Sequence, residues 1–133
     1  MAKLTLVLIL MSISTLARAS EWKYIARDIH GNTNYVDAES VLVQGDTRTY
    51  WRYVKLKEPQ TANDKIFYTV RTQESINCAK RTFRVLVTDY LDSKGTTVDY
   101  QDFRESNHQD PIPPDTVYDA IRKYVCSIKK TAE

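Results

Sequence analysis

The stretch TVYDAIRKYVCSIKK, residues 116–130, decides the fold class. Thr116 and Asp119 fit the T-x-x-[DE] capping box that begins a helix. Apolar residues then recur at the three- and four-residue spacings of one helical face: Val117, Ala120, Ile121, Tyr124, Val125 and Ile128. A helix of about three turns with such a stripe must bury it on another element. That element has to come from residues upstream.

Upstream of this helix lie short β-prone runs separated by turn residues, which is typical of an antiparallel sheet. The turn signals are His30-Gly31-Asn32, Gln44-Gly45-Asp46 and Asp92-Ser93-Lys94-Gly95. Predicted strands cover residues 22–27, 33–36, 41–43, 48–56, 66–72, 83–90 and 96–103, and predicted loops cover 58–64 and 107–114. We therefore predict an α+β fold, an antiparallel β-sheet of about six strands with a C-terminal helix packed on it.

The predicted strand at residues 83–90 shows the alternation best. Phe83, Val85 and Val87 alternate with polar residues, although Leu86 interrupts the polar face. Because successive side chains of a strand point to opposite faces, this pattern predicts all three on one face.

The N-terminus has the order of a secretory signal peptide. Lys3 precedes the apolar run at residues 4–13, and Ala17-Arg18-Ala19 supplies small residues before a cleavage point. A membrane anchor is the alternative, but a spanning helix needs about 20 apolar residues and this run has about ten. We predict a signal peptide at residues 1–19 and a single domain at residues 20–133. No cysteine follows the run, so we expect no lipid anchor and an exported protein, periplasmic rather than extracellular or on the cell surface.

The charge balance argues against nucleic acid as a partner. The full chain has 19 basic and 17 acidic residues, and Lys3 and Arg18 lie in the predicted signal peptide. The mature chain therefore carries 17 of each sign. A nucleic-acid-binding surface needs a clustered basic excess.

Two cysteines, Cys78 and Cys126, lie in the mature part. An even cysteine count in an exported protein predicts a disulfide. Buried thiols or a redox pair are the alternatives, but the close C-x-x-C spacing of a redox pair is absent. The predicted bond would fasten the helix to the sheet.

The sequence predicts no catalytic site, metal or cofactor. The histidines, His30 and His108, fall in a turn and in a Pro-rich stretch, far from any nucleophile motif. Four carboxyls flank one predicted hairpin, namely Asp89, Asp92, Asp99 and Asp102. Such a group could supply an acid and a base for a small hydrolase, or hold Ca²⁺ weakly, but solvated strand and turn acids are the favoured interpretation.

Aromatic residues are the stronger functional signal, because the chain contains nine Tyr and two Trp. On one predicted strand, Tyr50 and Arg52 must point opposite to Trp51 and Tyr53. One helix covers one face, so one of these pairs faces outward. Cross-strand pairing that only stabilises the sheet is one explanation. The other is a binding surface for a protein, a glycan or a second subunit, with candidate residues Tyr50, Arg52, Trp51, Tyr53 and Arg71.

Several motifs together resemble the surface-adhesin protein E-like family of bacterial exported proteins. They are Trp22, Asn34-Tyr35-Val36-Asp37 with Ser40, Trp51, Lys57-Glu58-Pro59, the Cys78 segment with Arg81, Ile112-Pro113-Pro114-Asp115-Thr116-Val117 and Tyr124-Val125-Cys126. The resemblance implies an antiparallel sheet with a C-terminal helix. It also implies adhesion to host extracellular-matrix proteins by analogy with the family's named member, which is anchored by a lipidated cysteine that this chain lacks.

We therefore expect a non-enzymatic exported binding or envelope-accessory domain. A surface adhesin for host matrix proteins is the first alternative, and a small carboxylate-dependent hydrolase is the second.

Overall fold

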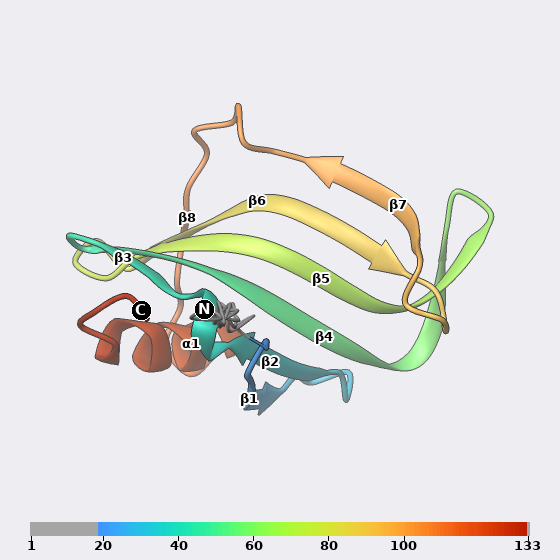
Figure 1. The fold of residues 1–133 in the computed structure, drawn as a ribbon, viewed down its shortest axis with the longest axis horizontal. Helices are drawn as coiled ribbons and strands as arrows, with labels where there is room; N and C mark the ends of the chain where they lie inside the picture. Colours follow the sequence, from blue (N-terminus) through green and yellow to red (C-terminus); the bar gives the residue numbers. More distant parts are fainter. Residues whose placement is uncertain (1–18, 133) are drawn as a thin grey trace, which may run out of the picture.

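A computed structural model describes residues 19–132, so the predicted signal peptide lies almost wholly outside the described residues. A large antiparallel sheet and one C-terminal helix make up the fold (Figure 1). The strands are β1 (Trp22–Arg27), β2 (Thr33–Asp37), β3 (Leu42–Gln44), β4 (Thr47–Ala62), β5 (Lys65–Asn77), β6 (Thr82–Leu91), β7 (Thr97–Asp102) and β8 (Asp110–Pro111). A short 3₁₀ helix, η1 (Ala38–Ser40), joins β2 to β3, and the helix α1 spans Val117–Ser127.

The sheet has a path of six strands in the order β1-β2-β4-β5-β6-β7. Two short strands add to it, since β3 pairs with β4 and β8 pairs with β6. The predicted α+β fold is therefore confirmed, with eight strands instead of about six. In Figure 1 the chain returns from β7 past the end of the sheet to α1, which lies on one face beside β1 and β2. No helix in residues 19–132 is long and apolar enough to cross a membrane.

The predicted loop at residues 58–64 is wrong, because β4 continues to Ala62 and turns at Asn63 and Asp64. The β4–β5 ladder is interrupted between Lys55 and Gln60, where four residues of β4 oppose Tyr68 alone. Pro59 lies in this interruption. A proline has no N–H to donate, so it is tolerated in a strand only where the ladder bond is already missing.

The predicted single face for Phe83, Val85 and Val87 is also wrong. Gln73 of β5 pairs with Val87, and the next residue, Glu74, pairs with Val85. Leu86 is the extra residue of this β-bulge, and an extra residue reverses the faces beyond it. Phe83 and Val85 therefore share the helix side with Glu74, whereas Val87 lies on the other face.

The helix begins as the capping box predicts. The Thr116 hydroxyl oxygen accepts a hydrogen bond from the backbone N–H of Asp119 at 3.2 Å. The Asp119 carboxylate accepts in return from the backbone N–H of Asp115 at 3.1 Å, one residue before the expected donor. Two free backbone donors are thus satisfied at the N-terminus of α1.

The predicted disulfide is present and joins the end of β5 to α1 through Cys78 and Cys126, whose Cα atoms lie 5.9 Å apart. Ile121 and Val125 of α1 are fully buried against the sheet. They close a core whose sheet-side members are Val36, Val41, Tyr50 and Ile76. The covalent bond and the apolar core hold the helix to one face of the sheet only.

Candidate functional site

The structure decides which pair of β4 side chains faces outward. Tyr50 is fully buried on the helix side, and the Arg52 Nη2 donates to the Tyr118 hydroxyl of α1 at 3.1 Å. Trp51 and Tyr53 therefore point away from the helix. They lie on the other face of the sheet, which we call the open face. Of the five candidate residues, Tyr50 and Arg52 do not belong to an exposed surface, whereas Trp51, Tyr53 and Arg71 share the open face.

Glu74 is the centre of a polar cluster beneath the helix, and its side chain is completely buried. Arg52 donates to Glu74 Oε1 from Nη2 at 2.7 Å and from Nε at 3.0 Å. Three hydroxyls complete the set, from Tyr50 to Oε2 at 2.9 Å and from Thr72 and Tyr118 to Oε1 at 2.9 Å each. We call these five residues the Glu74 cluster. It joins β4, β5 and α1, and every group in it has a partner.

The pKa directions in the Glu74 cluster match this structural role. Burial raises the pKa of Tyr50 well above its ordinary value, and the neighbouring Glu74 charge adds to the effect. Burial and the same charge raise the pKa of Tyr118. Burial opposes the charge of Arg52, but Glu74 together with the Tyr118 and Tyr50 phenols outweighs burial and raises the pKa of the guanidinium. Both phenols thus stay protonated and Arg52 stays charged, which suits a permanent network and no proton transfer.

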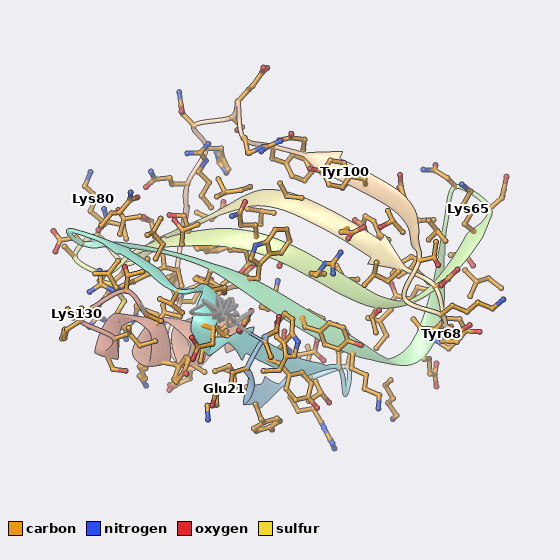
Figure 2. All side chains as sticks on the ribbon, in the orientation of Figure 1. Glu21, Lys65, Tyr68, Lys80, Tyr100 and Lys130 are labelled. Carbon is orange, nitrogen blue, oxygen red and sulfur yellow. A yellow bond between two sulfur atoms is a disulfide. The ribbon has the colours of Figure 1, made fainter. Side chains whose placement is uncertain are left out.

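The open face carries a row of side chains that crosses all six strands of the main path. Direct cross-strand pairing links successive members, which are Tyr24, Tyr35, Tyr53, Arg71, Asp89 and Tyr100. We call this set the cross-strand row. Because neighbouring strands lie about 4.8 Å apart, the row is about 24 Å long. Figure 2 labels its last member, Tyr100 on β7.

Aromatic rings fill the β1–β4 end of the row. The ring centroids of Tyr24 and Tyr35 lie 6.1 Å apart, as do those of Tyr35 and Tyr53. Trp22 adds a ring 5.5 Å from Tyr53. Tyr24 is 60% exposed and Trp22 is 38% exposed, so part of this aromatic surface is open to solvent. The hydroxyls of the three tyrosines donate to no acceptor within residues 19–132.

A hollow of about 270 Å³ lies beside these rings and is lined by Ser20, Trp22, Asp37, Trp51 and Arg71. The Arg71 guanidinium lies 5.9 Å from the centre of the Trp51 ring. The Asp37 carboxylate is already occupied, because Oδ1 accepts from the backbone N–H groups of Glu21 and Glu39. The polar residues of the hollow that remain accessible are therefore Arg71, whose side chain is 44% exposed, and the exposed Ser20.

Two basic residues, Arg71 and Lys55, lie beside the aromatic rings on the open face. Arg71 pairs with Asp89 at 2.6 Å, and Thr97 also donates to Asp89 at 2.7 Å, so this carboxylate is buried and satisfied. Lys55 lies two residues beyond Tyr53 on the same strand and the same face. Its side chain is exposed and forms no ion pair with any described residue. Among the described residues, Lys55 therefore places one positive charge without an ion-pair partner beside the aromatic part of the open face, whereas the charge of Arg71 is paired with Asp89.

The four carboxyls considered for hydrolysis are each used in local structure. Asp89 pairs with Arg71, and Asp92 accepts from two backbone N–H groups of its own turn. Asp99 accepts from Asn63 at 3.1 Å, and Arg104 holds the pKa of Asp102 down to about 2. The hollow that touches this group, lined by residues 102–106, includes Asp102 alone of the four. This arrangement does not supply a paired acid and base.

The histidines lie apart from one another and from the open face. The backbone N–H of His30 donates to Asp28 in the β1–β2 turn, and His108 Nε2 lies 2.9 Å from Asp110 Oδ1 at the surface. No group of three or more His, Cys, Asp or Glu side chains within residues 19–132 is arranged to hold a metal ion.

Sequence reasoning missed both Glu74 and the β1–β2 part of the cross-strand row. A signal for Glu74 was present, since it alternates with Thr72 and Ile76 in a strand and so shares the face of an apolar residue. Tyr24 and Tyr35 each sit in a predicted strand. Their meeting with Tyr53 depends on register between strands, which alternation within one strand does not reveal.

Comparison with known proteins agrees with this architecture. The family model of surface-adhesin protein E matches residues 22–127. A structure of Haemophilus influenzae protein E is similar with a TM-score of 0.60 and 19% identity, covering 84% of this chain and 91% of that chain. A structure of protein E from non-typeable Haemophilus influenzae is similar with a TM-score of 0.56 and 23% identity, covering 85% and 79%. No curated protein matches the sequence.

Proposed function

The chain belongs to the surface-adhesin protein E family, and from this premise we propose that it is an exported, non-enzymatic binding domain. Its ligand binds the open face of the sheet, at the aromatic part of the cross-strand row. The main support for the proposal is that the two faces of the sheet use their polar and aromatic side chains differently. The helix-covered face satisfies its polar groups internally, whereas the open face leaves rings and a lysine for a partner.

The composition of the open face supports this proposal. Tyr, Trp and Arg are the residues that dominate binding energy at protein interfaces, because each brings a large contact area together with a polar group. Trp22, Trp51, Tyr53 and Arg71 gather around one hollow. Exposed aromatic surface of this kind on a small domain marks an interaction site.

Site-specific photo-crosslinking in intact cells tests the proposal. A photoreactive phenylalanine analogue placed at Tyr24 should form adducts with a partner, because this side chain projects from the open face. The same analogue at Tyr68 is the matched control, since Tyr68 is also exposed but lies on the far part of β5 (Figure 2). Adducts at position 24 and none at position 68 support the proposal. Equal yields at both positions, or none at position 24, contradict it.

Adhesion to host matrix proteins is a second candidate, and membership of the family favours it. It requires the open face to be displayed outside the cell. Labelling of intact cells with a membrane-impermeant reagent, followed by fractionation, separates the candidates. Labelled protein at the surface supports adhesion, whereas a chain confined to the periplasm rules adhesion out and leaves an envelope role.

A further inference from the structure

We infer that the ligand of the open face is a linear acidic oligosaccharide that lies along the cross-strand row. This inference rests on the proposed function and names its ligand class. It follows from the shape of the row, from the kind of side chains in and around it, and from its charge.

The shape of the row fits a linear polymer. The row is one side chain wide and crosses six strands, so its surface is long and narrow, with the buried Asp89 as a gap between Arg71 and Tyr100. The ring centroids of Tyr24, Tyr35 and Tyr53 follow one another at 6.1 Å, a spacing comparable to the repeat of sugar rings along an extended glycan. A pyranose ring has apolar C–H groups on its faces and hydroxyls at its rim. Successive sugar rings can therefore contact Tyr24, Tyr35 and Tyr53 while their hydroxyls stay hydrated.

The side chains flanking the row favour a glycan over a protein. Positions on the open face next to the row carry short hydroxyls and an amide, at Thr33, Thr69 and Gln73, and the indole of Trp51. Of the aliphatic residues on this face, Val87 and Leu91 of β6 are buried, whereas Leu42 of β3, opposite Thr49, is 40% exposed. A protein partner of standard size instead buries roughly 800 Å² on each side, a broader area than a row one side chain wide. Aromatic rings bordered by hydroxyls match sugar chemistry better.

The charge of the row favours an acidic glycan. Lys55 has no ion-pair partner among residues 19–132, and Arg71 keeps exposed N–H groups although one of them binds Asp89. The carboxylates nearest the rings, Asp37 and Asp89, are both buried and hydrogen-bonded within the protein. A carboxylate or sulfate on a sugar ring can then pair with Lys55, and Arg71 can donate to it from the N–H groups that Asp89 does not bind.

Tryptophan fluorescence gives a direct readout, because both tryptophans of the chain, Trp22 and Trp51, lie on the open face. The probes are a heparin-derived octasaccharide, a hyaluronan-derived octasaccharide, cellohexaose as a neutral glycan and octa-glutamate as an acidic peptide. We expect a saturable fluorescence change with the two acidic octasaccharides. An acidic disaccharide should bind about tenfold more weakly, because it is too short to reach from Tyr24 to Arg71.

Matched variants locate the binding. Tyr24→Ala and Lys55→Gln should each weaken octasaccharide binding about tenfold, whereas Tyr68→Ala and Lys65→Gln should leave it unchanged. The control residues are exposed and lie on the β4–β5 hairpin, away from the row (Figure 2). Equal loss in row and control variants would overturn the inference.

The remaining outcomes separate this inference from the proposed function. A response to octa-glutamate or cellohexaose as strong as to the acidic octasaccharides overturns the acidic glycan. No fluorescence response to any oligosaccharide, with crosslinks still forming at position 24 in cells, also overturns the glycan and leaves the binding domain standing. Absence of both signals overturns the two together.

Discussion

The two faces of this sheet use the same residue types for opposite purposes. On the helix side, the hydroxyls of Tyr50 and Tyr118 bind Glu74, and the Tyr118 ring stacks on Phe83 at 3.7 Å. On the open face, Tyr24, Tyr35 and Tyr53 contact one another through their rings and leave their hydroxyls to solvent. A tyrosine here serves the core when an internal acceptor receives its hydroxyl, whether it lies in a strand, as Tyr50 does, or in the helix, as Tyr118 does. Without such an acceptor it remains available to a ligand.

Removing Glu74 should have the largest effect on stability, because it removes the acceptor on which the helix side depends. Glu74→Ala leaves the buried Arg52 charge and three hydroxyls without their acceptor, and removal of one partner of a buried pair costs about 3–5 kcal/mol. The free energy of unfolding, from urea titration, should fall by that amount. Glu74→Gln keeps the side-chain shape and should lose less. A loss below about 1 kcal/mol in Glu74→Ala would show that the cluster does not hold the helix.

Opening the disulfide should have the next largest effect. Cys126→Ser should lower the free energy of unfolding by about 2–4 kcal/mol, because the unfolded chain regains the entropy of a 48-residue loop. Hydrogen exchange should show faster exchange in α1 than in β4 and β5, since the helix loses its covalent tie. Equal loss of protection in helix and sheet would contradict a helix that depends on this bond.

High pH should weaken the helix side selectively. The pKa values of Tyr50 and Tyr118 are raised by burial in the folded protein. Their contribution to stability is therefore fully present below the unfolded value of about 10 and is lost as pH rises above it. Each phenol should remove about 1.4 kcal/mol per pH unit in that window. Urea titrations at pH 8, 10 and 11 measure the slope.

Double Tyr→Phe variants on the two faces test the cause of this dependence of stability on pH. Tyr50→Phe with Tyr118→Phe should flatten the dependence on pH, even though this variant is less stable at pH 8. Tyr24→Phe with Tyr100→Phe should leave the slope as it is. A slope that changes only in the second variant would contradict the assignment to the buried phenols.

Truncation on the open face should have the smallest effect on stability. Trp51→Ala should lower the free energy of unfolding by about 1 kcal/mol, because its ring is partly buried beside Arg71. Tyr24→Ala should change it by less, about 0.5 kcal/mol. Both should nevertheless lose ligand binding. A fall of 3 kcal/mol or more in the free energy of unfolding of Trp51→Ala would mean that this side chain belongs to the core. It would contradict the distinction between the two faces.

Sequence patterns within single segments predicted the helix and most of the strands. Most of the errors concern features that depend on pairing between distant strands. The helix at residues 117–127 and its cap follow from the apolar period and from Thr116. The extension of β4 through Pro59 was not predictable, because a proline argues against a strand unless a bulge removes its partner. Leu86 did mark an irregularity, but only the pairing of β5 with β6 shows that it is a bulge.

The candidate site was predicted in part for the same reason. Alternation along β4 separated Trp51 and Tyr53 from Tyr50 and Arg52. It could not say which pair α1 covers, because that depends on where a segment far along the chain docks. The Asn34, Arg52, Glu74 and Tyr118 contacts decide it, and these residues come from four separate elements.

The contact between the first strand and the last helix has a consequence for when the protein can fold. β1 packs against α1, and the core around Tyr50 and Ile76 stays uncovered until Ile121 and Val125 arrive. Contacts between segments so distant in sequence form slowly, because the intervening chain must first be brought together. A chain threaded across a membrane from its N-terminus could therefore not complete this core until its final residues emerge, and only then could Cys78 and Cys126 meet and be oxidised.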